Sequence, residues 1–194
     1  PLTQRDIKCG GHSIEARLYA EDPANGFAPG FGALPCLELP EDVVGVRIDT
    51  GVDEGDEITV HYDPMIAKLI VHADDREGAC RSMSEALMQV RIAGPTTNER
   101  FLRAISDHTE FRAGGIDTEF IARNLEALAP PVREVPEYIE AVAALAVLTR
   151  ARLGDGDASP WTGNQGWRLG GGSRRRIAFA GQGWEREFVL GISG

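Results

Sequence analysis

The spacing of apolar residues changes near residue 74, and this change limits the folds that the chain can adopt. Between residues 12 and 21 every second residue is apolar, which is typical of a β-strand with one buried face. The apolar face holds Ile14, Ala16, Leu18 and Ala20, and the other face holds Glu15, Arg17, Tyr19 and Glu21. Beyond residue 74 the apolar residues recur at helical spacing. The chain is therefore expected to combine a sheet with packed helices, which is an α+β fold.

The first 73 residues are expected to be mostly strands and turns. Further strands are predicted at Ala33–Leu39, Val43–Asp49, Glu57–Tyr62 and Met65–Val71. Pro64 lacks a backbone N–H and therefore marks a bend or a sheet edge before the last of these strands. Three helices should follow, each preceded by a capping residue. The expected caps are Asp74 with Glu77, Thr96 with Glu99, and Asp117 ahead of Phe120.

The segment Ala129-Pro130-Pro131 predicts a domain boundary, because paired prolines interrupt regular structure. We expect one domain over residues 1–129 and a second over residues 130–194. The second begins with a helix over Val135–Leu153 that has Pro136 in its first turn. A polar, glycine-rich stretch at 154–166 follows. Strands are then predicted at Trp167–Leu169, Arg175–Ala180 and Glu185–Leu190, the last two forming a hairpin.

Composition and motifs exclude several functional classes. The net charge of −10 weighs against a nucleic-acid surface. The longest apolar run, Ala141–Leu148, is too short to cross a bilayer. Three widely spaced cysteines, with no CxxC pair, argue against disulfides or a zinc site and favour a reducing compartment. The four histidines have no metal-ligand spacing, and no complete catalytic motif is present, so no metal site is predicted.

Polar residues on otherwise apolar strands are the remaining candidates for chemistry. Glu15 and Arg17 leave the same strand face roughly 6.6 Å apart, given a rise of about 3.3 Å per residue. The planar guanidinium of Arg17 suits the two oxygens of a carboxylate or of bicarbonate. The alternative is an ordinary salt bridge on a wet sheet face. Asp63, beside Pro64, could hold an arginine or a ligand amide, or be a plain turn residue. Arg47 is either a surface charge or an interface anchor.

Three segments resemble known sequences. Residues Gly11–Pro23 (GHSIEARLYAEDP) resemble the strand that opens the C-terminal part of biotin carboxylases. Residues Gly51–Leu69 (GVDEGDEITVHYDPMIAKL) are similar to a late motif of that family, and Gly94–Asn98, Phe111–Gly115 and Asp117–Phe120 match its end. The chain is thus identified as a piece of a biotin-dependent acyl-CoA carboxylase. It looks most like the methylcrotonyl-CoA type, with the propionyl-CoA and acetyl-CoA types close.

The resemblance implies an antiparallel β-sheet with packed helices, followed by a helix and an incomplete β-barrel that starts the partner-docking segment. It implies ATP-dependent carboxylation of biotin with bicarbonate in a longer parent protein, with biotin, ATP and Mg²⁺ or Mn²⁺ as cofactors. The piece alone is expected to be inactive. A carboxyltransferase beta subunit and a biotin carrier domain are the implied partners in a hetero-oligomer. The alternative is a non-catalytic assembly module that docks the carboxyltransferase. The implied location is the bacterial cytoplasm or the mitochondrial matrix.

The resemblance also implies roles for four residues. Arg17 matches the arginine that contacts bicarbonate and the ureido oxygen of biotin, where it would stabilise an enolate-like anion. Asp63 matches an aspartate near that arginine, which it would orient. Thr118 falls where the family places a residue against adenine. Arg47 matches a position at the dimer interface of free-standing biotin carboxylases.

Overall fold

The computed structural model describes residues 2–130, 136–153, 173–181 and 184–192. The contacts within the chain divide it into two compact units, Pro1–Pro131 and Val132–Gly194. Each unit has its own secondary structure.

An antiparallel sheet of three strands forms the centre of the first unit. Its order is β1 (His12–Tyr19), β8 (Met65–Ala73) and β6 (Val46–Thr50), so the longest strand lies in the middle. Arg17 lies opposite Lys68 on β8, and Asp49 on β6 lies opposite the same lysine. The β1–β8 register shifts between Leu18 and Tyr19. This irregularity marks the end of regular pairing.

Short strand pairs extend the first unit beyond this sheet. β2 (Glu21–Asp22) pairs with β3 (Ala28–Pro29), β4 (Gly32–Ala33) with β7 (Glu57–Ile58), and β5 (Cys36–Glu38) with β9 (Arg91–Ala93). Two short 3₁₀ turns, η1 (Gln4–Asp6) and η2 (Pro23–Asn25), flank β1 and β2. All the strand pairs are antiparallel, as predicted for this fold class.

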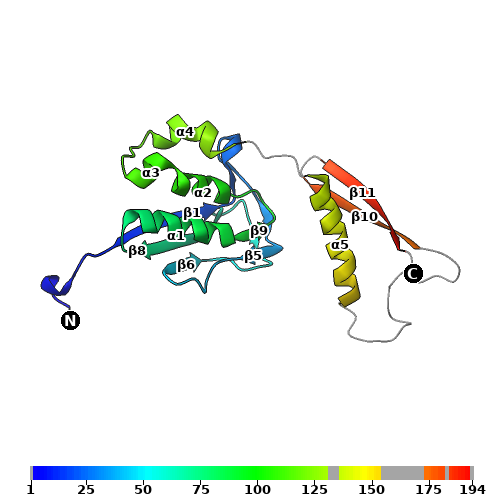
Figure 1. The fold of residues 1–194 in the computed structure, drawn as a ribbon, viewed down its shortest axis with the longest axis horizontal. Helices are drawn as coiled ribbons and strands as arrows, with labels where there is room; N and C mark the ends of the chain where they lie inside the picture. Colours follow the sequence, from blue (N-terminus) through cyan, green and yellow to red (C-terminus); the bar gives the residue numbers. More distant parts are fainter. Residues whose placement is uncertain (1, 131–135, 154–172, 182–183, 193–194) are drawn as a thin grey trace. The chain divides into compact units, whose positions relative to one another are not determined.

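Four helices follow the sheet in sequence: α1 (Arg76–Gln89), α2 (Glu99–Asp107), α3 (Thr109–Ala113) and α4 (Phe120–Leu128). Helix α1 packs against β1 and β8, and α2 packs on α1 (Figure 1). Asp75 caps α1, since its carboxylate accepts a hydrogen bond from the Gly78 backbone N–H at 2.7 Å. One face of the sheet is therefore covered by helix.

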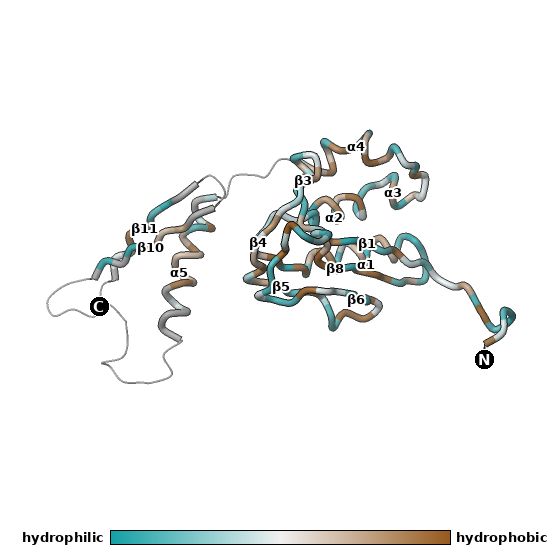
Figure 2. Tube along the Cα trace, turned by 180° about the vertical axis from the view of Figure 1, so that it is seen from behind, coloured by the Kyte–Doolittle hydropathy of each residue, from teal (hydrophilic) through white to brown (hydrophobic). Residues whose placement is uncertain are grey.

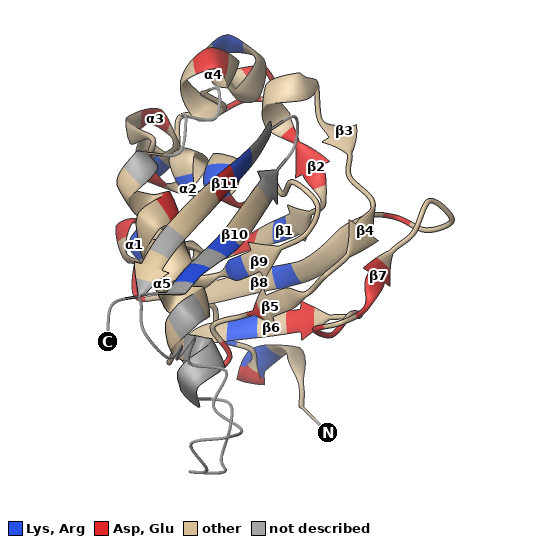
Figure 3. Cartoon of the chain, turned by 90° about the vertical axis from the view of Figure 1, so that its right-hand side faces the viewer, with Lys and Arg blue, Asp and Glu red and all other residues tan. Residues whose placement is uncertain are grey.

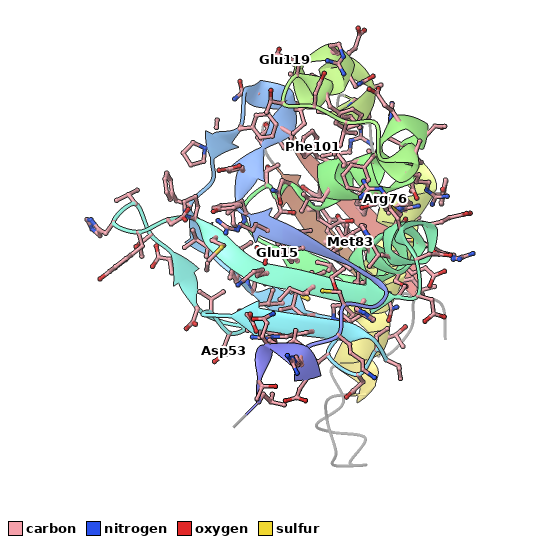
Figure 4. The ribbon with its side chains drawn as sticks, turned by 90° about the vertical axis from the view of Figure 1, so that its left-hand side faces the viewer. Glu15, Asp53, Arg76, Met83, Phe101 and Glu119 are labelled. Atoms are coloured by element: carbon pink, nitrogen blue, oxygen red, sulfur yellow. The ribbon has the colours of Figure 1, made fainter. Side chains whose placement is uncertain are left out.

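The core lies between α1 and that face of the sheet. Its fully buried side chains are Leu18, Leu34, Ile66, Leu69, Val71, Cys80, Met83 and Leu87. Apolar residues recur along β8 and α1 in Figure 2, and Met83 is labelled in Figure 4. Burying a side chain of this size contributes roughly 1.5–3 kcal/mol, so this layer is the main source of stability in the unit.

A smaller aromatic cluster joins α2, α3 and α4. Phe101 and Phe120 are buried in it, and Phe27 meets Phe101 edge to face with ring centroids 5.2 Å apart. Arg76, in the first turn of α1, donates hydrogen bonds to the Phe111 carbonyl at 3.0 and 2.6 Å. Its guanidinium lies 4.8 Å from the centroid of the Phe111 ring. These contacts hold α3 against α1.

The second unit consists of a helix and a hairpin. Helix α5 spans Glu137–Leu153, and β10 (Ser173–Gly181) pairs with β11 (Trp184–Ile192) in antiparallel register. Arg186 on β11 donates to the buried Glu140 carboxylate of α5 at 3.0 Å. The predicted helix and hairpin are confirmed. Within the described residues the hairpin stands as a two-stranded sheet, and no closed barrel is present.

Several predicted elements end differently. The strand expected from Val43 begins at Val46, because Val46 donates to the Val43 carbonyl and closes a turn first. The strand predicted at Ala33–Leu39 is divided between β4 and β5, which belong to different pairs. The one predicted at Glu57–Tyr62 ends at Ile58.

The predicted helix caps are shifted by one or two residues. Asp75 replaces Asp74 and Asn98 replaces Thr96 at the cap position, while Glu119 precedes α4. The short α3 and β9 were not predicted, since five and three residues carry too little periodicity. The predicted stretch at 154–166 and the strand Trp167–Leu169 lie outside the described residues.

Candidate functional site

The three-stranded sheet has one face that packs against the core and a second face, the open face, that carries charged residues. Because side chains alternate along a strand, the residues between the core positions all lie on this face. They are Glu15, Arg17 and Tyr19 from β1, Lys68 and Ile70 from β8, and Arg47 and Asp49 from β6. Figure 3 marks basic residues on β6 and β8 and an acidic residue on β6. The open face is the most highly charged part of the sheet.

Arg17 lies on the edge strand β1 of this face, and its side chain is 61% exposed. Its Nε donates a hydrogen bond to Glu15 Oε1 at 3.3 Å, and this contact, followed by one with Tyr19, raises the pKa of Arg17. The predicted Glu15–Arg17 proximity is therefore present. Exposed pairs of this kind contribute little to stability. The guanidinium has five N–H donors, of which the contacts with Glu15 and Tyr19 use only some, so it retains donors for a ligand.

Asn98 fixes the backbone that carries Arg17. Its Nδ2 donates to the Arg17 carbonyl at 3.1 Å, and its Oδ1 accepts from the Tyr19 N–H at 2.9 Å. The Asn98 N–H also donates to the Tyr19 carbonyl at 3.1 Å. Asn98 is buried, with 6% exposure. A side chain amide thus replaces a neighbouring strand along this edge of β1, and it holds Arg17 in place.

Asp63 lies at one end of the open face and contacts Tyr19. The Tyr19 hydroxyl donates to Asp63 Oδ2 at 3.2 Å. Burial, followed by the charge of Asp63, raises the pKa of Glu21. In the described residues the contact of Asp63 is with Tyr19, while Arg17 contacts Glu15. Asp63 is therefore linked to Arg17 indirectly, through Tyr19.

A hollow of about 480 Å³ opens next to Asp63 and Lys68. Its walls come from β6 and the two residues after it, from β7, from the segment between β7 and β8, and from the first part of β8. Among its lining residues are Asp49, Thr50, Glu57, Tyr62, Asp63 and Lys68. The hollow adjoins the open face at Lys68. A ligand on that face could therefore extend into it.

Arg47 is on the same face but on the far strand. Its Nε and Nη2 donate to the two carboxylate oxygens of Asp49 at 2.9 and 3.1 Å. This hydrogen bond is the main reason why the pKa of Asp49 is lowered. Arg47 is 73% exposed. Its position is compatible with both alternatives, a surface charge and an interface anchor.

Thr118 lies in a different part of the first unit. It is exposed in the turn before α4, where Asp117 accepts from the Glu119 N–H at 3.0 Å and pairs with Arg123 at 2.9 Å. Figure 4 shows Glu119 there, apart from Glu15 on β1. The structure thus brings Arg17, Asp63 and Arg47 to one face of the sheet and leaves Thr118 elsewhere.

Two residues of this site were not singled out from the sequence. Lys68 was part of a predicted strand, but its position opposite Arg17 depends on the β1–β8 register, which a single sequence does not contain. Asn98 belongs to the segment Gly94–Asn98, and its contacts are with residues 79 and 81 positions earlier in the chain. Such pairing requires the tertiary fold.

Within the described ranges no helix is long and apolar enough to span a membrane. The same residues contain no group of three or more side chains of the types that hold metal ions.

Comparison with known proteins gives a consistent set of relatives. Residues 15–123 match the biotin carboxylase C-terminal domain. The alpha subunit of mitochondrial methylcrotonoyl-CoA carboxylase from Dictyostelium discoideum is 39% identical over 183 residues, covering 92% of this chain and 26% of that protein. The Rattus norvegicus protein of the same name is 44% identical over 152 residues, covering 78% and 21%. The chain thus spans about a quarter of the length of these relatives.

A solved structure is also similar. The biotin carboxylase domain of 2-oxoglutarate carboxylase from Hydrogenobacter thermophilus, a dimer in complex with MgADP, ADP and bicarbonate, superposes with a TM-score of 0.64. The two sequences are 36% identical, and the match covers 69% of this chain and 29% of that one. The likeness therefore concerns both fold and sequence.

Proposed function

Because the chain belongs to the family of biotin carboxylase C-terminal domains, we propose that it forms one wall of the biotin-carboxylating site in a longer acyl-CoA carboxylase subunit. The names of the two relatives favour the methylcrotonyl-CoA type. In such a protein ATP activates bicarbonate, and the ureido nitrogen of biotin accepts the resulting CO₂. The residues that bind the nucleotide and deprotonate bicarbonate belong, in this proposal, to other parts of the parent.

The observation that carries the proposal is the placement of Arg17. It is exposed on β1, and its guanidinium retains N–H donors for an acceptor. A guanidinium can donate two parallel hydrogen bonds to bicarbonate or to the ureido oxygen of biotin. Its fixed positive charge would stabilise negative charge that develops on that oxygen. Because Asn98 holds the strand at Arg17, little reorganisation would be needed.

The other predicted residues have supporting roles in this proposal. Asp63 keeps Tyr19 beside Arg17 and thereby helps to orient the arginine. Arg47, with Asp49, serves at an interface between subunits. Thr118 contacts the adenine from the turn before α4. We assign no residue of this chain to Mg²⁺ or Mn²⁺, which would accompany ATP in the parent.

The second unit is proposed to dock the carboxyltransferase beta subunit. In this assignment residues 1–129 are the C-terminal subdomain of the biotin carboxylase, and residues 130–194 are a linker helix and the start of the docking segment. The exposure of apolar side chains along α5 supports a docking role. Tyr138, Val142 and Leu145 are 68%, 61% and 62% exposed, and their spacing places them along one side of the helix.

The parent is then a hetero-oligomer that also contains a biotin carrier domain. Its location would be the mitochondrial matrix in a eukaryote or the cytoplasm in a bacterium. The relatives are named as mitochondrial proteins, which supports the first location.

A carboxylation assay of the intact complex tests the proposal. Full-length parent and beta subunit are purified together and supplied with ATP, labelled bicarbonate and one acyl-CoA at a time. We expect label to enter methylcrotonyl-CoA faster than propionyl-CoA or acetyl-CoA, and only with ATP present. The 194-residue chain alone should hydrolyse no ATP. The absence of ATP-dependent label on biotin in the complex would disprove the function, and equal rates for the three substrates would disprove the methylcrotonyl-CoA assignment.

A further inference from the structure

Lys68 lies directly between two partners on the open face of the sheet. It is opposite Arg17 on one side and opposite Asp49 on the other, and all three side chains leave the same face. Lysine is rare in this sequence, which has eighteen arginines and only two lysines, Lys8 and Lys68. Lys68 is only 31% exposed. This position therefore places a second cation next to the arginine of the proposed site.

Two cations at directly opposite positions of an antiparallel pair repel each other. Their Cβ atoms are typically 4.5–5.5 Å apart, and like charges at that separation are destabilising. The carboxylates on the open face offset this repulsion only in part. Glu15 pairs with Arg17 at 3.3 Å, but Asp49, which is 3.5 Å from Lys68, also pairs with Arg47 at 2.9 Å, so two carboxylates serve three cations. Among the described residues no carboxylate contacts both Arg17 and Lys68. A monoanion bound between Arg17 and Lys68 would balance the remaining positive charge and reduce the repulsion between the two cations.

The contact between Lys68 and Asp49 is weak enough to leave the lysine available. Asp49 is held by two hydrogen bonds from Arg47 at 2.9 and 3.1 Å, both shorter than its 3.5 Å contact with Lys68. The carboxylate is thus already satisfied by Arg47. Lys68 can turn toward a ligand without leaving Asp49 unpaired.

We propose that Lys68 is a second anion-binding residue of the site and that, together with Arg17, it binds a small oxyanion of the bicarbonate or carboxylate class. This inference rests on the proposed function and adds a specificity residue to it. The two side chains are complementary, because the guanidinium can donate to two oxygens in one plane while the ammonium is a compact charge that can donate to a remaining lone pair of the same anion. Lys68 also lines the hollow of about 480 Å³, which gives the ligand access from that side.

The first test measures the lysine directly in the 194-residue chain. Both lysines are acetylated with a limiting amine-reactive ester, and mass spectrometry follows each site in bicarbonate and in chloride at equal ionic strength, so that screening is the same. The exposed Lys8 is the internal control. Bicarbonate should slow acetylation of Lys68 severalfold and leave Lys8 unchanged, and Arg17→Ala should abolish the protection. Equal rates at Lys68 in the two salts would overturn the proposal.

The second test uses the full-length parent and its carboxylation of biotin. Lys68→Gln should raise KM for bicarbonate about tenfold, the effect of losing one hydrogen bond to a charged group, while KM for ATP stays the same. Lys68→Arg should restore the value, and Lys8→Gln is the matched control. An unchanged KM for bicarbonate in Lys68→Gln would overturn the assignment. If the wild-type parent does not carboxylate biotin, the proposed function fails, but the acetylation experiment still decides whether Lys68 binds an anion.

Discussion

The two faces of the β1–β8–β6 sheet differ completely, although they are built from adjacent residues. Leu18 and Leu69 are fully buried, while their chain neighbours Arg17 and Lys68 are on the open face. Helix α1 packs on the face that holds the leucines. On the open face, Arg17 contacts Glu15 at 3.3 Å and Lys68 contacts Asp49 at 3.5 Å. Because side chains alternate between the two faces of a strand, one residue contributes to stability and the next is available for chemistry. Substitutions at adjacent positions should therefore have opposite consequences.

The largest expected effect is on the core face. Leu69→Ala removes a fully buried side chain from the middle strand and should lower the free energy of unfolding by about 2–5 kcal/mol. The matched control is Lys68→Ala one residue earlier, which should change it by no more than about 0.5 kcal/mol. Urea denaturation of the 194-residue chain, followed by circular dichroism, measures both. Equal losses in the two variants would mean that the two faces contribute equally to stability, which would contradict this comparison.

Asn98 should be an exception to this contrast, because it is buried and yet supports the open face from the edge of β1. Its substitution should therefore affect both stability and activity. Asn98→Ala removes two side chain hydrogen bonds and leaves the Arg17 carbonyl and the Tyr19 N–H without partners, a loss of about 1–3 kcal/mol. Asn124→Ala is the control, since Asn124 makes a hydrogen bond at 2.9 Å within α4. In the full-length parent, Asn98→Ala should also lower kcat for biotin carboxylation, and Asn124→Ala should not. A fully active Asn98→Ala enzyme would remove Asn98 from the site.

The smallest effect should be a gain in stability at Glu21 of β2, next to Asp63 at the end of the open face. Since burial and Asp63 raise the pKa of Glu21, the folded state retains a proton that the unfolded chain loses near pH 4.3. Stability from this group therefore falls as the pH rises through the interval between the unfolded and folded pKa values. Glu21→Gln should raise Tm by about 1 °C at pH 7 and leave it unchanged at pH 3.5.

The control for this measurement is Glu15→Gln, which loses a hydrogen bond to Arg17 and should give no gain at pH 7. If Glu21→Gln lowered Tm at pH 7, the ionised carboxylate would stabilise the fold, and the pKa of Glu21 would be lowered by folding and not raised.

Features of the fold and the site that depend on residues close together in the sequence could be predicted, and features that depend on distant residues could not. The alternation in β1 is local, so the strand, its two faces and the Glu15–Arg17 contact followed from the sequence. The helix positions of α1, α2, α4 and α5 followed from apolar periodicity in the same way. Their caps were displaced by a residue or two, because several neighbouring polar residues could serve.

The features that could not be predicted depend on register and on long-range contacts. Nothing local to Lys68 indicates that it lies opposite Arg17, and nothing local to Asn98 indicates that it completes the edge of β1. The roles of Arg17 and Asp63 came from resemblance, and the sheet adds only that both border one face. Asp63 was expected beside Arg17, and the structure places Tyr19 as its hydrogen-bond partner. Thr118 stays a prediction that no contact in the first unit supports.

The central claim is that the guanidinium of Arg17 acts on the reaction and not on the fold. The most direct measurement compares Arg17→Ala with Arg47→Ala in the full-length parent, since both arginines are exposed on the same face and pair with a carboxylate two residues away. We predict that Arg17→Ala lowers kcat for ATP-dependent biotin carboxylation by about 10²–10³, the usual cost of removing one donor to a developing oxyanion, with Tm unchanged. Arg47→Ala should retain most of the rate. Full activity in Arg17→Ala, or a loss that is matched by unfolding, would contradict this account.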